Sequence, residues 1–460
     1  MQEVLRDTQN QSALYVQIPD GDERGVVQVF QDALEDLHAV SPDRSGFPKP
    51  RDIKDFASVA SGIAELCRSG VVVALDEFQY FHRAALRPFT SFPQAEVDRL
   101  RDTARGGIFV LGSIHTEMTA ILENRNSPLF NRVTDRLDLG HWDFSTLFEM
   151  FAAHKIEDHS TRLFFWSLFE GVPKFYRDAF DQGVLNPSSS RVEVLQRLFF
   201  EGTSPLKDEA SNWFLGELRG RFESILRLLA KLQPCGHGTL EAEYIALGSA
   251  ERAPLASYLK TLIERYRLVE ARQPVFGKPG GRKARYALTD NFLSAWLAGI
   301  RRAVEFSRLR PAHEAVLRAE PGLIVHEGYA FEKAVRLLTE EVSRRGGDEL
   351  ALTEIVRGYW NKSIPSDDSI EIDLVALAED QKMIRLGSCK RSSGKHDRLA
   401  LQKFEGHIER FLTTKEGKRF AGWQIQRALY SPEFSDREKL DFSTRGYICR
   451  DLGDFARYLK

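Results

Sequence analysis

The sequence has few cysteines, no long apolar run and no excess of charge of either sign. The four cysteines, Cys67, Cys235, Cys389 and Cys449, are too widely spaced for a zinc site or a disulfide framework. Apolar runs such as Val71–Leu75 are far shorter than the ~20 residues of a transmembrane helix, and the first residues lack the apolar stretch of a signal peptide. Lys and Arg number 64, and Asp and Glu number 66. The net charge of -2 excludes a uniformly basic nucleic-acid-coating protein but not local basic patches. We expect a reduced, cytoplasmic protein without a membrane span.

The length and composition are those of a globular protein with several domains. At about 150 residues per domain, 460 residues predict roughly three domains. Hydrophobic residues make up 42 % and charged residues 28 %, which is enough apolar material for an ordinary buried core. Disordered, collagen-like and small disulfide-stabilised proteins are therefore excluded.

Residues 1–155 alternate predicted strands and helices. The strands are Ala13–Ile18, Gly70–Leu75 and Gly107–Leu111, and the helices between them are Gly25–Val40 and Asp52–Ser69. The Val-rich run Gly70–Leu75 is typical of a parallel strand whose two sheet faces are both covered. The alternation predicts a parallel α/β sheet.

The middle of the chain is predicted to be helical and to end in a hairpin. Residues 156–222 carry Phe, Leu and Arg at helical spacing. Residues 223–300 predict three helices and two strands, namely Glu223–Leu232, Leu240–Leu247, Ala253–Tyr266, Leu268–Pro274 and Ala284–Leu288. The loop between the strands contains three glycines and a proline, which force a turn. Three helices followed by a glycine-tipped hairpin are the pattern of a winged helix.

A strand ending in two carboxylates is the clearest signal in the N-terminal part. Val71–Leu75 is followed by Asp76 and Glu77, which is the form of a Walker B element. At the carboxyl end of a parallel strand, Asp76 would hold a Mg²⁺-bound water and Glu77 would polarise the attacking water. Ser113, after the next strand, would sense the γ-phosphate. The alternative is that the two carboxylates only end the strand, and for the dipeptide alone that interpretation is favoured.

The glycine-rich phosphate-binding loop GxxxxGK[ST] is absent from the sequence. Lys395 is followed by His396 and Lys278 by Pro279, so neither Gly-Lys pair completes the motif. We expect the N-terminal domain to be incomplete by one βα unit, about 30 residues. Without the amides and the lysine of such a loop, we expect weak ATP binding.

The predicted hairpin is rich in cations. Its loop and the adjoining strand residues carry Arg272, Lys278, Arg282, Lys283 and Arg285, with no acidic residue between the first and the last. The helix before the hairpin carries Lys260, where a winged helix faces the DNA groove. A cationic hairpin tip suits phosphate and minor-groove contacts. A solvated turn on a protein-interaction module is the alternative, and we weigh the two about equally.

Two carboxylates and a lysine are predicted to meet near the C-terminus. Strands are predicted at Glu371–Leu377 and Met383–Lys390, so Asp373 and Lys390 lie close together if these strands pair. Glu332 lies on the helix predicted at 328–345. Carboxylates bind Mg²⁺ and a lysine steadies the charge of an attacking water, as in a metal-dependent phosphodiesterase. The alternative is a pair of solvated strand-end carboxylates beside one of many basic residues.

A basic stretch surrounds this predicted site. Residues 381–420 hold eleven Lys or Arg and four acidic residues, on a chain whose net charge is -2. Arg391 and Lys395 directly follow the second predicted strand. Such a concentration of cations is typical of a surface that binds a phosphate backbone, and a solvated helix face is the alternative.

The order of these motifs resembles that of the archaeal-type ATPases of the STAND/AAA-like P-loop class. The segments that carry the resemblance are Asp76-Glu77-Phe78-Gln79, Gly112-Ser113, Asn126-Ser127-Pro128-Leu129 with Arg132, Leu137-Asp138-Leu139, Phe144-Ser145, Gly171-Val172-Pro173-Lys174-Phe175-Tyr176 and Tyr286-Ala287-Leu288-Thr289-Asp290-Asn291-Phe292-Leu293. The resemblance covers nearly the whole chain. It implies Mg²⁺ and ATP as cofactors, with binding that is weak or absent here because the P-loop is missing.

The C-terminal part resembles the PD-(D/E)xK nuclease fold, which that family carries as a domain of unassigned function. The resemblance implies that Asp373 is the metal-binding aspartate, Lys390 the lysine of the motif and Glu332 the helix glutamate. Ser388 stands at the metal-ligand position where the family has Glu or Asp, and a hydroxyl binds hard cations poorly. We therefore expect a catalytically weak or inactive site.

These observations predict an α/β protein of four parts. They are a P-loop NTPase-like core lacking Walker A (1–155), a helical lid (156–222), a winged helix (223–300) and a restriction-endonuclease-like α/β domain (301–460). The expected function is that of an AAA/STAND-like ATPase-family protein with a DNA-binding winged helix and a degenerate nuclease-like domain, acting in nucleic-acid-associated regulation or DNA processing. A non-catalytic scaffold that binds DNA or protein is the alternative, and whether the chain is an enzyme stays open. DNA is the expected partner, a protein partner and an oligomer stay open, and no membrane contact is expected.

Overall fold

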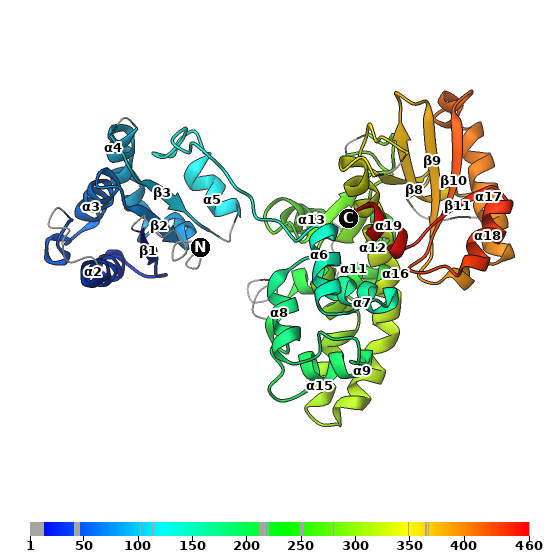
Figure 1. Ribbon diagram of the computed structural model, residues 1–460, viewed down its shortest axis with the longest axis horizontal. Helices are drawn as coiled ribbons and strands as arrows, with labels where there is room; N and C mark the ends of the chain where they lie inside the picture. Colours follow the sequence, from blue (N-terminus) through cyan, green and yellow to red (C-terminus); the bar gives the residue numbers. More distant parts are fainter. Residues whose placement is uncertain are drawn as a thin grey trace. The chain divides into compact units, whose positions relative to one another are not determined.

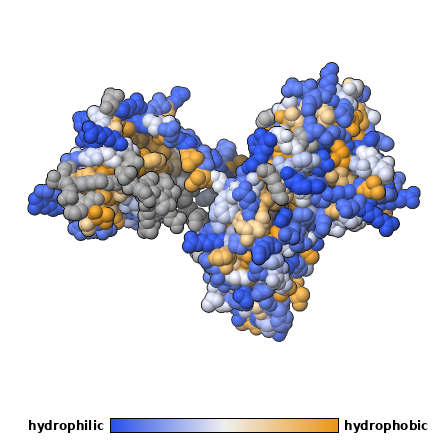
Figure 2. Space-filling model, viewed as in Figure 1, coloured by the Kyte–Doolittle hydropathy of each residue, from blue (hydrophilic) through white to orange (hydrophobic). Residues whose placement is uncertain are grey.

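The computed structural model divides the chain into two compact units, Met1–Leu139 and Gly140–Lys460 (Figure 1). It describes residues 13–40, 47–101, 103–112, 115–210, 218, 220–248, 253–278, 280–347, 349–363, 366 and 368–459. No helix in these described ranges is both long and apolar enough to cross a membrane. Hydrophilic residues cover much of the visible face of the second unit (Figure 2).

The first unit contains a three-stranded parallel sheet, as predicted. Its strands are β1 (Ala13–Gln17), β2 (Val72–Asp76) and β3 (Gly107–Val110), in that order across the sheet. The helical elements are α2 (Glu23–Val40), η1 (Pro50–Asp52), α3 (Phe56–Arg68), η2 (Phe78–His82), η3 (Arg87–Thr90), α4 (Ser91–Leu100) and α5 (His115–Leu122). The central strand β2 is largely buried because apolar faces of α2 and α3 join the same hydrophobic core.

The helix predicted at Asp52–Ser69 begins four residues later. Asp55 caps α3, since its side chain accepts the backbone N–H of Ser58 while the Ser58 hydroxyl accepts the N–H of Asp55. This reciprocal capping box satisfies N–H groups that a helix start leaves without partners. Residues Pro50–Asp52 form a separate 3-10 turn.

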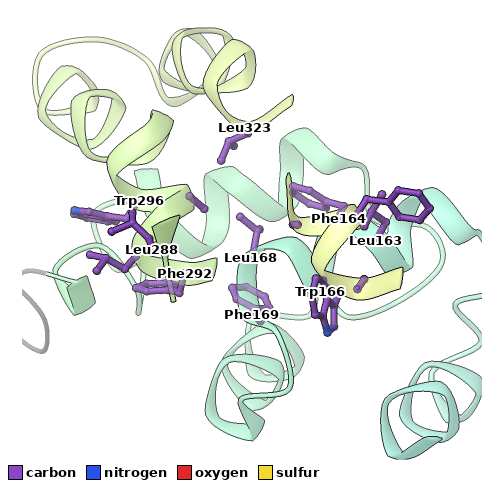
Figure 3. Packing of buried hydrophobic residues seen from close by; sticks show 14 of the residues in the cluster. Leu163, Phe164, Trp166, Leu168, Phe169, Leu288, Phe292, Trp296 and Leu323 are labelled. Carbon is purple, nitrogen blue, oxygen red and sulfur yellow. The ribbon is translucent and has the colours of Figure 1, made fainter. Parts of the chain in front are cut away.

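The second unit starts with a helical region packed around aromatic side chains. Its elements are α6 (Phe144–Ala153), α7 (His159–Phe169), α8 (Pro173–Asp181), α9 (Arg191–Leu195) and η4 (Gln196–Phe200). Every residue from Leu163 to Phe169 is buried, so α7 is enclosed on all sides. Phe169 of α7 lies in one core with Phe292 and Trp296, and Leu323 of α16 belongs to the same core (Figure 3). The predicted helical character of this region is confirmed.

The predicted three helices and hairpin are present in the next segment. They are α11 (Arg221–Leu232), β4 (Cys235–Gly236), α12 (His237–Ala246), α13 (Ala253–Glu264), β5 (Val269–Arg272) and β6 (Arg285–Leu288). The three strands form a small antiparallel sheet in the order β4-β6-β5. The elements α14 (Asn291–Ala295), η5 (Trp296–Ile300) and α15 (Arg301–Ser307) follow.

The long helix α16 (Ala312–Arg344) joins the helical region to the C-terminal sheet. It begins well before the predicted start at Gly328 and contains Pro321 within its length. A Pro-Gly pair ordinarily indicates a break. Here Gly322 allows close packing, because a Cβ at this position would lie 2.2 Å from the carbonyl oxygen of Ala298.

A five-stranded mixed sheet forms the C-terminal part. Its order is β11-β10-β9-β8-β7. The pairs β7–β8 and β8–β9 are antiparallel, and the pairs β9–β10 and β10–β11 are parallel. The strands are β7 (Arg357–Trp360), β8 (Glu371–Ala378), β9 (Met383–Cys389), β10 (Gln424–Tyr430) and β11 (Tyr447–Arg450). The helical elements are η6 (Ser393–Lys395), α17 (Arg398–Thr413), η7 (Gly417–Phe420), α18 (Asp436–Thr444) and α19 (Leu452–Tyr458). The predicted pairing of the two strands that carry Asp373 and Ser388 is confirmed.

Candidate functional site

Asp373 lies where β8 and β9 separate. Leu374 pairs with Gly387, and beyond this pair the Asp373 side chain takes over the bonding to β9. Its Oδ2 accepts the backbone N–H of Cys389 at 2.8 Å and lies 3.4 Å from the Oγ of Ser388. The Nζ of Lys390 is 3.7 Å from the same oxygen. The structure therefore places Asp373, Ser388 and Lys390 together, as the sequence predicts.

A β-bulge sets the direction of Asp373. Tyr359 on β7 pairs with Ile372 and Arg357 pairs with Val375, so β8 carries one residue more than β7 across this interval. Ile372 and Val375 face one hydrophobic core and Leu374 the other, which shows that the alternation of side chains shifts at Asp373. Bulges commonly lie beside active sites, where the extra residue re-aims a side chain.

Glu332 of α16 completes the predicted cluster. The carboxylates of Glu332 and Glu371 both raise the pKa of Asp373, while Lys390 lowers it. The largest effect is burial, and the pKa of Asp373 rises to about 6. Glu332 itself is paired with Arg336. The site thus combines a protonatable carboxyl group and a partly exposed lysine.

A divalent cation does not fit this arrangement. Within the described ranges, no group of three or more His, Cys, Asp or Glu residues is placed to hold a metal ion. Ser388 is buried and supplies only a hydroxyl, and Asp373 is occupied by an amide N–H and by Lys390. We therefore derive no metal-dependent step for this site.

Two arginines predicted to bind nucleic acid have ion-pair partners within the protein. The side chain of Arg285 is only 5 % exposed, pairs with Glu371 and lies over the Trp360 ring at 4.8 Å. Arg391 donates to the buried carboxylate of Glu327 at 2.7 Å. Arg285 is therefore both paired and buried, whereas the Arg391 side chain is paired but 32 % exposed.

Glu327 and His407 were not predicted from the sequence, and Glu371 was expected only as a solvated strand-end carboxylate. The Nδ1 of His407 on α17 accepts the backbone N–H of Glu371 at 3.2 Å and a guanidinium N–H of Arg410 at 3.1 Å. Burial lowers the pKa of His407, and Lys390 lowers it further. The only signal in the sequence for the role of His407 as a hydrogen-bond acceptor was a polar residue on a buried helix face.

The other predicted cations of the hairpin and its helix differ in exposure. Lys278 and Arg282 are exposed and Lys283 is half-buried. Arg272 pairs with Glu270, which lies just before the acid-free stretch. Two more predicted contacts stay exposed: Lys260, which lies 3.9 Å from Glu264, and Lys395 in η6.

The N-terminal carboxylates lie at the carboxyl end of the central strand β2. Asp76 accepts a hydrogen bond from the hydroxyl of Tyr15 and another from the backbone N–H of Glu77 at 2.8 Å. Burial and Asp76 raise the pKa of Tyr15 to about 12. Glu77 has a left-handed backbone (φ 56°) and accepts a hydrogen bond from Gln79. Ser113, the third predicted residue, lies outside the described residues.

Mg²⁺ and ATP are not matched by the groups present around β2. Both Asp76 oxygens have protein donors, and the described part of the unit places no metal-binding group of three such side chains there. Arg132, part of the family resemblance, is held by Asp98 through two hydrogen bonds of 2.7 and 3.0 Å. No nucleotide-dependent step follows from these contacts.

Comparisons with known proteins give little further information. No protein-family profile matches the chain, and no curated protein matches it. Among solved structures, a Walker-type ATPase of Pyrococcus abyssi is similar at 15% identity and a TM-score of 0.45, over 62% of this chain and 84% of that one. At this identity and TM-score, the match assigns no role to any residue of this chain.

Proposed function

We propose that this chain is a nucleic-acid-binding protein of the AAA/STAND-like ATPase type, with a winged helix at 223–300 and a degenerate PD-(D/E)xK nuclease-like domain at its C-terminus. The observation that carries the proposal is the meeting of Asp373, Ser388 and Lys390 at the neighbouring strands β8 and β9, with Glu332 of α16 close enough to raise the pKa of Asp373. The element order of three helices and a hairpin supports a winged helix.

Lys390 is the phosphate-binding group of the site. Its side chain is 35 % exposed, and its carboxylate partner Asp373 is 3.7 Å away, at the long end of ion-pair distances. A phosphate oxygen is a good acceptor for such an ammonium group. Because the described residues around Asp373 offer no set of three metal-binding side chains, the site binds the backbone and cleaves it poorly or not at all.

Nucleotide binding by the first unit is a second candidate function. Asp76 and Glu77 lie at the carboxyl end of a central parallel strand, where open α/β sheets bind ligands. The absence of GxxxxGK[ST] from the sequence argues for weak binding. A protein-binding scaffold is the alternative to both candidate functions. Titrations with nucleic acid and with ATP separate such a scaffold from a nucleic-acid-binding or nucleotide-binding protein.

The test is nucleic-acid binding as a function of salt. Fluorescence anisotropy with two unrelated labelled duplexes, from about 50 to about 200 mM salt, should show similar affinities that fall steeply with salt. Lys390→Gln should reduce the slope of log K against log[salt] by about 0.9, the value of one lost phosphate contact. Lys155→Gln is the matched control, because Lys155 is exposed on the loop after α6.

Two outcomes would contradict the proposal. If neither duplex binds at low salt, the chain is not a nucleic-acid-binding protein. If Lys390→Gln leaves the slope unchanged while the wild-type protein binds, the site does not contact the backbone. The Lys155→Gln control should match wild type in both affinity and slope.

A further inference from the structure

The loop of the β5–β6 hairpin is docked on the C-terminal sheet. The backbone N–H of Val275 donates to the carbonyl oxygen of Gly358 on β7 at 2.9 Å, and Val275 itself is buried in the core of that sheet. On the other limb, the indole N–H of Trp360 donates to the carbonyl oxygen of Lys283 at 2.7 Å. The loop is therefore held at both ends along the outer edge of β7.

An aromatic contact holds Phe276, near the start of this loop, against η7. The ring of Phe276 lies 5.7 Å from that of Phe420, and the guanidinium of Arg419 lies 5.2 Å from the Phe276 ring. Phe276 adopts a left-handed backbone (φ 66°), which is costly for an aromatic residue. Such a conformation persists only where surrounding contacts determine it, and the packing on Phe420 supplies them.

The turn at η7 is equally constrained. A Cβ at Gly417 would lie 2.0 Å from the carbonyl oxygen of Phe411, so this position requires glycine. The N–H of Gly417 donates to the hydroxyl of Thr414 at 3.0 Å. Phe420 is buried in the same core as Val275. Loop and turn therefore form one rigid platform.

Exposed cations lie on both halves of this platform. They are Lys278 and Arg282 from the hairpin loop and Lys415, Lys418 and Arg419 from the turn, and we call them the loop–η7 surface. Only Arg419 has an ion-pair partner among the described residues, Glu379 at 3.9 Å. Glu416 is the one acidic residue within these two segments. The surface is thus strongly cationic on a chain whose net charge is -2.

We propose that the loop–η7 surface is a single composite site for the phosphodiester backbone of a nucleic acid. The proposal rests on the proposed function and adds a second backbone-binding surface to the Lys390 site. A backbone presents regularly spaced phosphates, which suit cations held at fixed positions, and a rigid site loses little conformational entropy on binding. Isolated wing contacts would not need the turn, whereas a composite site needs both segments.

The test is a double-substitution series measured by anisotropy across the same salt range. Lys278→Gln and Lys418→Gln should each reduce the slope of log K against log[salt] by about 0.9, and the double variant by about twice that. Lys155→Gln serves again as the control and should change nothing. Duplex DNA, duplex RNA and single-stranded DNA are tested separately to identify which source of phosphodiester binds.

The outcomes separate this inference from the proposed function. If the slope of log K against log[salt] falls in Lys278→Gln but not in Lys418→Gln, the composite site is overturned. Binding by the wild-type protein would still support the proposed function. Binding of poly-glutamate at the affinity of a duplex also overturns it, because the surface would then suit acidic polypeptides. No binding by wild type overturns both. Melting curves of each variant should match wild type, since both lysines are exposed.

Discussion

Replacing Asp373 by Asn is expected to stabilise the protein at neutral and alkaline pH. Burial is the main cause that raises the pKa of Asp373 from its ordinary 3.8 to about 6. This difference of about two units, at about 1.4 kcal/mol per unit, corresponds to about 3 kcal/mol lost from the free energy of unfolding when Asp373 is ionised. The opposing attraction of Lys390 is already included in the raised pKa.

The sign of the pH dependence follows from the direction of the shift. Because the folded pKa exceeds the unfolded one, the native state holds an extra proton between about pH 4 and about pH 6. The free energy of unfolding therefore falls as pH rises through this window and stays lower above it. Asp373→Asn lacks this loss, and its side-chain oxygen still accepts the N–H of Cys389.

Urea denaturation at several pH values measures the effect. The variant should unfold with about 3 kcal/mol more free energy than wild type near pH 8, and the difference should vanish near pH 4. Asp290→Asn is the matched control, since burial and Glu170 raise the pKa of Asp290 to about 6 as well. It should show the same pH dependence without changing nucleic-acid binding. An Asp373→Asn protein less stable than wild type near pH 8 would refute the reasoning.

Three further expectations concern the remaining parts of the chain. ATP with Mg²⁺ should bind weakly in a titration of labelled nucleotide, because the sequence lacks the phosphate-binding loop; micromolar affinity would show that another segment holds the phosphates. Ser388→Glu adds a buried carboxylate beside Asp373, so its melting temperature should fall in EDTA and recover with Mn²⁺, and an equal metal effect on wild type would count against it. Gly417→Ala should lower stability by about 3 kcal/mol in thermal melting because of the 2.0 Å contact, whereas Gly406→Ala, with open space around it, should not.

Local patterns in the sequence were sufficient for most elements of the fold. The Val-rich run before Asp76 predicted a central parallel strand, and apolar alternation predicted β8 and β9 as neighbours. Those signals are patterns of apolar residues, and each strand's own sequence contains the pattern that predicts its burial. The predicted start of α16 was wrong because the helix continues through Pro321, where Gly322 packs closely on Ala298 of another segment.

The candidate site was predictable in its members but not in its environment. Asp373 and Lys390 followed from strand pairing, whereas the β-bulge that re-aims Asp373 depends on the register of β7, which no local pattern encodes. The hairpin cations show the same limit. Arg285 is the kind of residue that contacts DNA, but in the folded protein it pairs with Glu371 at the start of β8, a contact that the local sequence does not show.

The raised pKa of Asp373 separates this site from an ordinary strand end. The flanking residues Ile372 and Leu374 are apolar and fully buried, so the sheet itself has no need of a carboxylate between them. Apolar or amide residues would avoid the cost of ionisation, and a bulge there serves no pairing purpose. A buried carboxylate beside a lysine supports the proposed binding function, because perturbed carboxyl groups gather at binding and catalytic sites. Ser388 is a buried hydroxyl beside Asp373, so it adds no further charge to the site.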